Sequence, residues 1–134
     1  MKTYHCHKIA EGKGEGEVLF SEDPVNFYLV DPKTGVFIEP HHSLSGQCIT
    51  GKILVLPYGK ASSVVQADGM FQLKMTGNGP KALILQAPDT TLVASAIILE
   101  YPVVDKVDPA FFSEVKNGDR LCVDADAQTV TKLD

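Results

Sequence analysis

The sequence predicts an α/β fold, in which about three helices pack outside a barrel-like mixed sheet. Before residue 60, short apolar runs alternate with turn residues, which is typical of strands. From Ser63 onward, segments with helical spacing alternate with short apolar runs. A length of 134 residues corresponds to a single domain, residues 1–134, and is large enough to form a core without disulfides or a metal ion.

The first part of the chain is predicted to be rich in strands. These strands contain β-branched and aromatic residues and are separated by Asp-Pro and glycine turns. The expected strands are residues 17–20, 26–30, 36–38 and 52–56. The glycine-rich segment 12–16 precedes a strand and lacks the spacing of nucleotide-binding loops. We predict a flexible turn there, with a loop that contacts a ligand or partner as the alternative.

The second part should alternate between helices and strands. A helix from residue 63 to about 75 is followed by a break at 77–80 and a strand at 82–85. Asp89 is expected to cap a helix that ends near residue 99, before a strand at 103–104. Asp108 and Pro109 should open a third helix that ends at Asn117-Gly118. The chain then closes with a hairpin of residues 120–124 and 128–132.

Charge and cysteine content exclude several classes of function. The net charge of −5 and the absence of long Lys/Arg blocks argue against nucleic acid or an anionic membrane as the main partner. The polar start resembles no signal peptide, and no apolar run reaches ~18 residues, so we expect a cytoplasmic protein. Cys6, Cys48 and Cys122 are too widely spaced for a disulfide framework or a zinc site and should be reduced thiols.

The histidines provide no convincing metal site. On a strand, His5 and His7 would face one side and Cys6 the other, so at most two of the three could bind one ion. His41 and His42 are adjacent and are predicted to be loop residues, with His42 the better functional candidate. No metal ligand is therefore assigned to this chain.

The turn after residues 52–56 carries the best candidates for chemistry. Ser63 and Gln66 have the spacing of a capping box, which predicts Ser63 as the helix N-cap. Ser62 is then left exposed without a structural role and is our candidate catalytic residue. Lys60 adds a positive charge at the same turn, so Lys60 and Ser63 are candidate substrate-binding residues. The alternatives are a solvated lysine and two capping serines. No Ser-His-Asp order or Gly-x-Ser-x-Gly motif supports acyl transfer.

Several motifs in combination resemble a known family. They are residues 12–17, residues 30–35, His42 with Leu44 and Gly46, residues 51–57 with the serine turn, residues 82–85 and residues 102–104. In this order they are similar to the aconitase X swivel domain family. The chain departs from the family pattern at Ala61, where glycine is common, and at Val65-Gln66, where a Gly-Ser pair is common.

The resemblance implies a swivelling β/β/α domain that acts as the small subunit of a heteromeric hydro-lyase. Its partner would be a larger subunit that holds an iron–sulfur cluster, expected to be 4Fe-4S, while this chain binds no cofactor. The resemblance implies that the pair dehydrates (R)-5-phosphomevalonate to trans-anhydromevalonate 5-phosphate in the archaeal mevalonate pathway of isoprenoid synthesis. Ser62 occupies the position proposed in the family as the proton acceptor.

Two alternatives to this function remain open. A related branch of the family acts on cis-3-hydroxy-L-proline, commonly with both parts fused in one chain. A non-catalytic binding or regulatory subunit would need Ser62 and Ser63 only as helix caps. An independent hydrolase lacks a suitable base.

Overall fold

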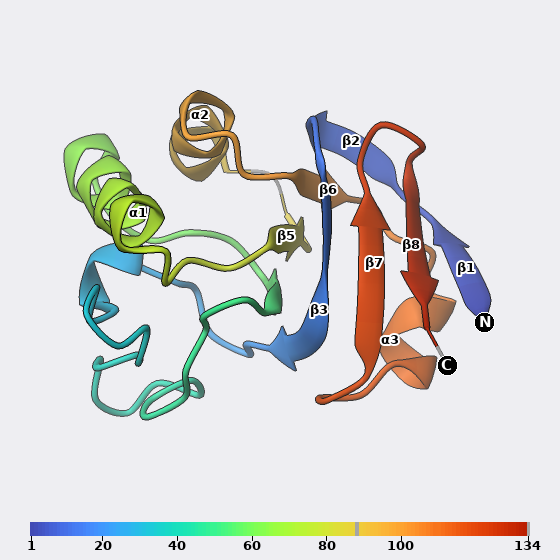
Figure 1. Cartoon of the computed structure of the whole chain (residues 1–134), viewed down its shortest axis with the longest axis horizontal. Helices are drawn as coiled ribbons and strands as arrows, with labels where there is room; N and C mark the ends of the chain where they lie inside the picture. Colours follow the sequence, from blue (N-terminus) through green and yellow to red (C-terminus); the bar gives the residue numbers. More distant parts are fainter. Residues whose placement is uncertain (88, 134) are drawn as a thin grey trace.

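The computed structural model describes residues 1–87 and 89–133. In this part of the chain, eight strands form one mixed sheet in the order β1-β8-β7-β3-β4-β5-β6-β2 (Figure 1). Four neighbouring strands run parallel, namely β3 (Lys13–Phe20), β4 (Ile53–Leu56), β5 (Ala82–Leu85) and β6 (Val103–Asp105). The antiparallel strands are β7 (Arg120–Asp124), β8 (Thr129–Lys132) and β1 (Lys2–His5) on one side, and β2 (His7–Ala10) on the other.

The two edges of the sheet meet through a single residue. β1 and β2 are the outermost strands, yet only Cys6 separates them along the chain. The sheet must therefore curl until its edges are close together, which gives the expected barrel-like shape.

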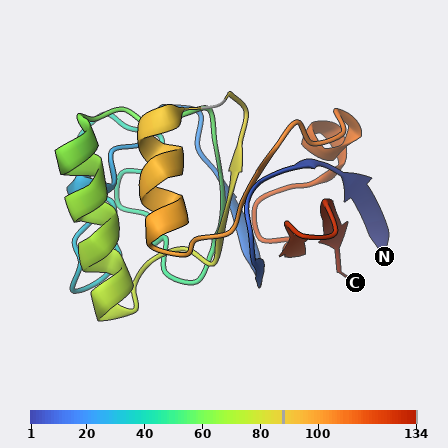
Figure 2. The ribbon, with the colours of Figure 1, turned by 90° about the horizontal axis from the view of Figure 1, so that it is seen from above.

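Two helices cover the outer face of the sheet. α1 (Ser63–Thr76) and α2 (Thr90–Ile98) lie side by side there, and α3 (Ala110–Glu114) lies on the opposite side (Figure 2). The expected mixed sheet with three helices is thus confirmed, with α1 and α2 on one side and α3 on the other. Phe111 of α3 packs edge-on against Tyr4 of β1 at a ring distance of 5.5 Å and helps to fill the inside of the curled sheet.

The buried residues form two cores, one on each face of the sheet. β4 contributes to both, because Leu54 and Leu56 face the core under α1 and α2 while Ile53 and Val55 face the inner core. All four side chains are fully buried. This continuous apolar run is typical of a parallel strand that is covered on both faces.

Two expected strands have another structure. Residues 26–30 contain a short 3-10 helix, η1 (Phe27–Leu29), which begins where Asn26 Oδ1 accepts a hydrogen bond from Tyr28 N at 3.0 Å. Residues 36–38 form only isolated bridges. Both segments belong to the long connection between β3 and β4, where side-chain caps and turns satisfy the backbone instead of a ladder.

The glycine-rich segment 12–16 is not a flexible turn. Most of it belongs to β3. The absence of glycine side chains, which suggested flexibility, instead allows other chain segments to pack closely against this strand. A Cβ at Gly14 would lie 2.6 Å from Lys81 O, and one at Gly16 would lie 2.3 Å from Gly51 O. Glycine is required because the chain segments that enter β5 and β4 cross this strand closely.

The predicted ends of the later elements are mostly correct. Asp89 caps α2 by accepting a hydrogen bond from Thr91 N at 3.1 Å, and Gly77 ends α1 in a left-handed conformation. The hairpin of β7 and β8 is also as predicted. α3 is shorter than expected, since it ends at Glu114 rather than at Asn117-Gly118.

Candidate functional site

The serine turn follows the carboxyl end of β4 and is held against residues 24–30. Val25 N donates to Tyr58 O at 3.1 Å, and Lys60 N donates to Val25 O at 3.0 Å. A Cβ at Gly59 would come within 2.6 Å of both Gln66 Nε2 and Asp89 Oδ2, so a larger residue there would displace these two side chains. The carboxyl ends of parallel strands are where open α/β sheets bind their ligands.

Ser62, and not Ser63, is the N-cap of α1. Ser62 Oγ accepts a hydrogen bond from Val65 N at 3.4 Å, and Ser62 O accepts one from Gln66 N at 3.0 Å. Ser63 is the first helical residue, and both serine side chains are exposed. The prediction of Ser63 as the cap is therefore wrong, as is the expectation that Ser62 has no structural role. The assignment of chemistry to Ser62 and Ser63 stays a prediction.

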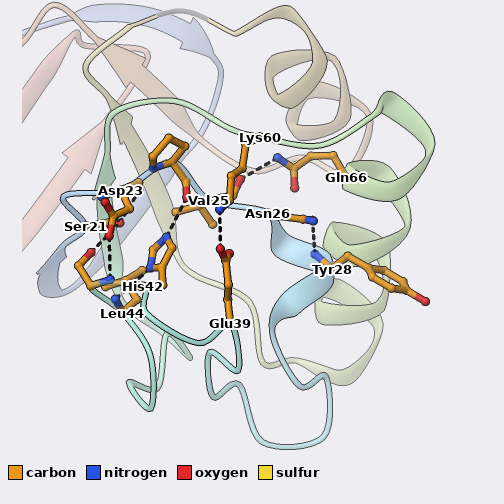
Figure 3. A network of polar contacts seen from close by, with 12 residues as sticks. Ser21, Asp23, Val25, Asn26, Tyr28, Glu39, His42, Leu44, Lys60 and Gln66 are labelled. Carbon is orange, nitrogen blue, oxygen red and sulfur yellow. Dashed lines mark hydrogen bonds and ion pairs between the residues drawn. The ribbon is translucent and has the colours of Figure 1, made fainter.

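Gln66 explains why the capping-box spacing was misleading. Its side chain is fully buried rather than folded back on the helix end. Its Oε1 accepts a hydrogen bond from Phe27 N at 2.8 Å. Its Nε2 donates to Val25 O at 3.0 Å (Figure 3). At this residue, where the chain departs from the family pattern, the glutamine joins α1 to Val25 and to the start of η1.

The N-cap position gives Ser62 Oγ a chemically useful environment. It lies at the end of a helix whose first backbone N–H groups lack intrahelical partners and favour negative charge. A hydrogen bond donated by Val65 N to Oγ favours the deprotonated hydroxyl over the neutral one. Capping and proton acceptance are therefore compatible roles for the same oxygen.

Lys60 is not a free cation in this structure. Its Nζ forms an ion pair with Glu39 Oε2, and the two side chains are 44% and 19% exposed. An ion pair at this degree of exposure stabilises a fold by about 0–1 kcal/mol. The other oxygen, Glu39 Oε1, is buried and has no hydrogen-bond partner in the described part of the chain. Such an oxygen costs roughly 1–3 kcal/mol of desolvation, so the pair has no evident value for stability.

His42 holds the loop that carries Glu39 and is not available as a base. Its Nδ1 accepts a hydrogen bond from Leu44 N at 3.0 Å, so the ring hydrogen lies on Nε2, which donates to Pro24 O at 2.8 Å. The ring is buried against Phe37 at a centroid distance of 4.4 Å. His42 is thus a structural residue that fixes the loop to residues 24–30 (Figure 3).

The described residues contain no cluster of three or more His, Cys, Asp or Glu side chains that could hold a metal ion. Cys6, Cys48 and Cys122 are free thiols in different parts of the fold. Burial raises the pKa of Cys6 to about 11, which disfavours the thiolate that a metal would need. His7 is instead bound to the buried Asp105, with Nδ1 and Oδ1 2.7 Å apart. The residues at positions 1–87 and 89–133 thus do not fit an iron–sulfur cluster.

The turn and the loop carry four candidate residues, of which sequence reasoning found three. Lys60, Ser62 and Ser63 were found because they follow a buried strand directly. Glu39 was missed because it lies 21 positions before Lys60 and has no motif of its own. Its position in the loop next to His42 was the only available signal.

Among the residues described, no helix is both long and apolar enough to cross a membrane.

Comparisons with known proteins agree on one family. The family model of the aconitase X swivel domain matches residues 3–132. The phosphomevalonate dehydratase small subunit of Methanococcoides burtonii is 44% identical over 130 residues, which cover 96% of this chain and 94% of the relative. The corresponding protein of Thermococcus kodakarensis is 41% identical over 128 residues, with coverage of 95% and 93%.

A solved structure supports the same assignment. The crystal structure of Thermococcus kodakaraensis aconitase X in its holo-form matches with a TM-score of 0.88 and 39% identity. The match covers 100% of both chains. Because the sequence and structural matches extend over nearly the whole length, the chain belongs to the aconitase X swivel domain family.

Proposed function

We propose that this chain is the small subunit of a phosphomevalonate dehydratase, a hydro-lyase that removes water from (R)-5-phosphomevalonate. The observation that carries the proposal is an exposed serine hydroxyl at the N-terminus of α1, in a chain whose relatives are named as small subunits of that enzyme. The product would be trans-anhydromevalonate 5-phosphate, and the enzyme would act in isoprenoid synthesis.

Ser62 would accept a proton in this reaction. Dehydration removes a proton from the carbon next to the one that bears the leaving hydroxyl. The hydroxyl departs as hydroxide and becomes water by taking up a proton, and Ser62 releases the proton it accepted before the next turnover, so that the net loss is one water. Ser62 Oγ is exposed and can approach a substrate that binds at the end of α1. Ser63 and Lys60 would bind the anionic groups of the substrate at the same turn, where backbone N–H groups also favour an anion.

The isolated chain cannot supply the activation that such a serine needs. Lowering the pKa of a hydroxyl toward neutrality requires a shift of several pKa units, and each unit is equivalent to about 1.4 kcal/mol. A helix N-terminus contributes only about 0.3–1 kcal/mol, or up to about 2 when partly buried. The remainder would come from a large subunit that closes over the turn. The expected 4Fe-4S cluster would also belong to that subunit, because the residues described here do not form a site for it.

Reconstitution tests the proposal. The chain would be co-expressed with the large aconitase-X-type subunit from its own organism and purified through a tag on the small chain. We expect a complex that converts (R)-5-phosphomevalonate into a product lighter by one water, as measured by mass spectrometry, whereas each subunit alone is inactive.

Competing functions predict other results. Turnover of cis-3-hydroxy-L-proline in place of the phosphorylated substrate would assign the chain to the other branch of the family. A stable complex in which Ser62→Ala is as active as the wild type would favour a non-catalytic binding or regulatory subunit. Activity of the large subunit alone would have the same meaning.

A further inference from the structure

Glu39 and Lys60 are brought together by one common scaffold, residues 24–30. Lys60 N donates to Val25 O, which fixes the serine turn to this segment. On the other side, Ile38 N donates to Leu29 O at 2.9 Å. His42 Nε2 donates to Pro24 O, so the residues on both sides of Glu39 are anchored to the same segment (Figure 3).

The carboxylate of Glu39 is arranged for Lys60 at a cost to the fold. Oε2 forms the ion pair, while Oε1 is buried and lacks a donor among the residues described. It is the one side-chain atom in the described part of the chain with this property. A glutamine, or a smaller uncharged residue, would avoid the buried negative charge. Stability therefore does not account for the placement of a carboxylate at this position.

We propose that Glu39 is a positioning residue, which holds the Lys60 ammonium beside the Ser62 turn so that it meets an anionic group of the hydroxy-acid substrate. The inference rests on the proposed function and adds a residue to that site. A related arrangement exists in protein kinases, where a Lys–Glu ion pair must be in place for the lysine to act on the phosphates of ATP. The pair leaves the remaining hydrogens of the Lys60 ammonium free to bind the substrate.

The central test is the kinetics of Glu39→Gln in the reconstituted complex with (R)-5-phosphomevalonate. Glutamine keeps the size of the side chain and removes its charge. We expect KM to rise about tenfold or more while kcat changes little, because a misplaced lysine weakens substrate binding. The double variant Glu39→Gln/Lys60→Met should be no worse than Lys60→Met alone, since Glu39 acts through Lys60.

A matched control exists elsewhere on the sheet. Glu17 forms an exposed ion pair with Lys52 at 3.0 Å, in the middle of β3 and just before the residues that pair with β4. Glu17→Gln removes the same charge from the same kind of pair and should leave KM unchanged. If Glu39 only neutralises Lys60, Glu39→Gln should instead lower KM. A lower or unchanged KM for Glu39→Gln would overturn the inference. Additive effects of the two substitutions in the double variant would also overturn it.

A second measurement examines the pair without catalysis. The lysines of the isolated chain would be labelled with isotope-enriched methyl groups and observed by NMR. We expect the Lys60 signal to shift in Glu39→Gln and not in Glu17→Gln, and an unmoved Lys60 signal would overturn the inference. An inactive wild-type complex would overturn the proposed function and this inference with it. An active complex that depends on Ser62 but not on Glu39 would overturn this inference alone.

Discussion

Ser62 is expected to serve both the fold and the reaction, because the oxygen that caps α1 is the one exposed at the turn. The capping bond from Val65 N is long, at 3.4 Å, so its contribution to stability should be small. Substitution by alanine removes the cap and the hydroxyl together, which would confuse the two roles. Variants that separate them are therefore needed.

A series at Ser62 and Ser63 makes this separation. Ser62→Ala should lower the free energy of unfolding by about 0.5–1 kcal/mol and turnover by orders of magnitude. Ser62→Asn keeps an N-cap acceptor but lacks the hydroxyl, so it should retain stability and still lose turnover. The measurements are the melting temperature of the small chain and kcat in the complex.

Ser63→Ala is the matched control for the fold. Ser63 is the first helical residue, and its side chain has no hydrogen bond in the described part of the chain, so its replacement should change stability by less than about 0.5 kcal/mol. A larger loss of stability for Ser63→Ala than for Ser62→Ala would show that the cap has been assigned to the wrong serine. Near-normal turnover of Ser62→Asn would remove the catalytic role.

At the scale of elements, the attachment of α1 to η1 determines where the serine turn lies. Gly69 of α1 lies against the backbone of η1, since a Cβ there would be 2.3 Å from Tyr28 N. Nearby, Gln66 satisfies Phe27 N, which would otherwise be a buried donor without a partner. Helix α1 therefore cannot move relative to residues 24–30 without breaking this bond.

Gln66→Leu tests that attachment. The leucine has a similar size but cannot accept a hydrogen bond from Phe27 N, so the free energy of unfolding should fall by roughly 1–3 kcal/mol. The control is Gln72→Leu in the same helix. Among the described residues, the Gln72 side chain forms one hydrogen bond, to Asp68, so the change should be within about 0.5 kcal/mol. Urea denaturation of both variants provides the comparison. Equal urea midpoints for the two variants would mean that Gln66 does not attach α1 to η1.

On the scale of the whole molecule, exposed apolar side chains lie next to each residue of the site. Ile38 precedes Glu39, Tyr58 precedes the turn, and Val64 follows the two serines. These side chains are 57%, 46% and 77% exposed. Exposed apolar side chains around the polar residues of the candidate site are typical of a surface that a protein partner covers.

Hydrogen exchange on binding of the large subunit tests this surface. We expect increased protection in residues 38–43 and 57–65, because both segments lie around the site. Segment 12–16 is the internal control and should not change. It lies at the start of β3, before the residues that pair with β4, whereas the serine turn follows the carboxyl end of β4. This segment therefore does not share a surface with the serine turn. Protection confined to the exposed Ile97 and Ile98 of α2 would place the partner elsewhere.

The sequence by itself determined what depends on neighbouring residues. The buried runs of β4 and β5, the cap at Asp89 and the hairpin of β7 and β8 follow from local periodicity and turn chemistry, and the structure confirms them. Ser62 and Lys60 could likewise be chosen as candidates, because they follow a buried strand directly. The family was recognised from motifs in a fixed order.

Only the tertiary structure decided what depends on contacts between distant segments. Gln66 does not complete a capping box with Ser63, because its side chain is buried and accepts a hydrogen bond from Phe27 N, 39 positions away. The cap is Ser62 instead. Segment 12–16 became a strand because two other chain segments pass close to its glycines. Glu39 reached Lys60 because both of their segments are bonded to residues 24–30. A buried donor, a close approach and a shared scaffold are properties of the packed chain, and no local pattern contains them.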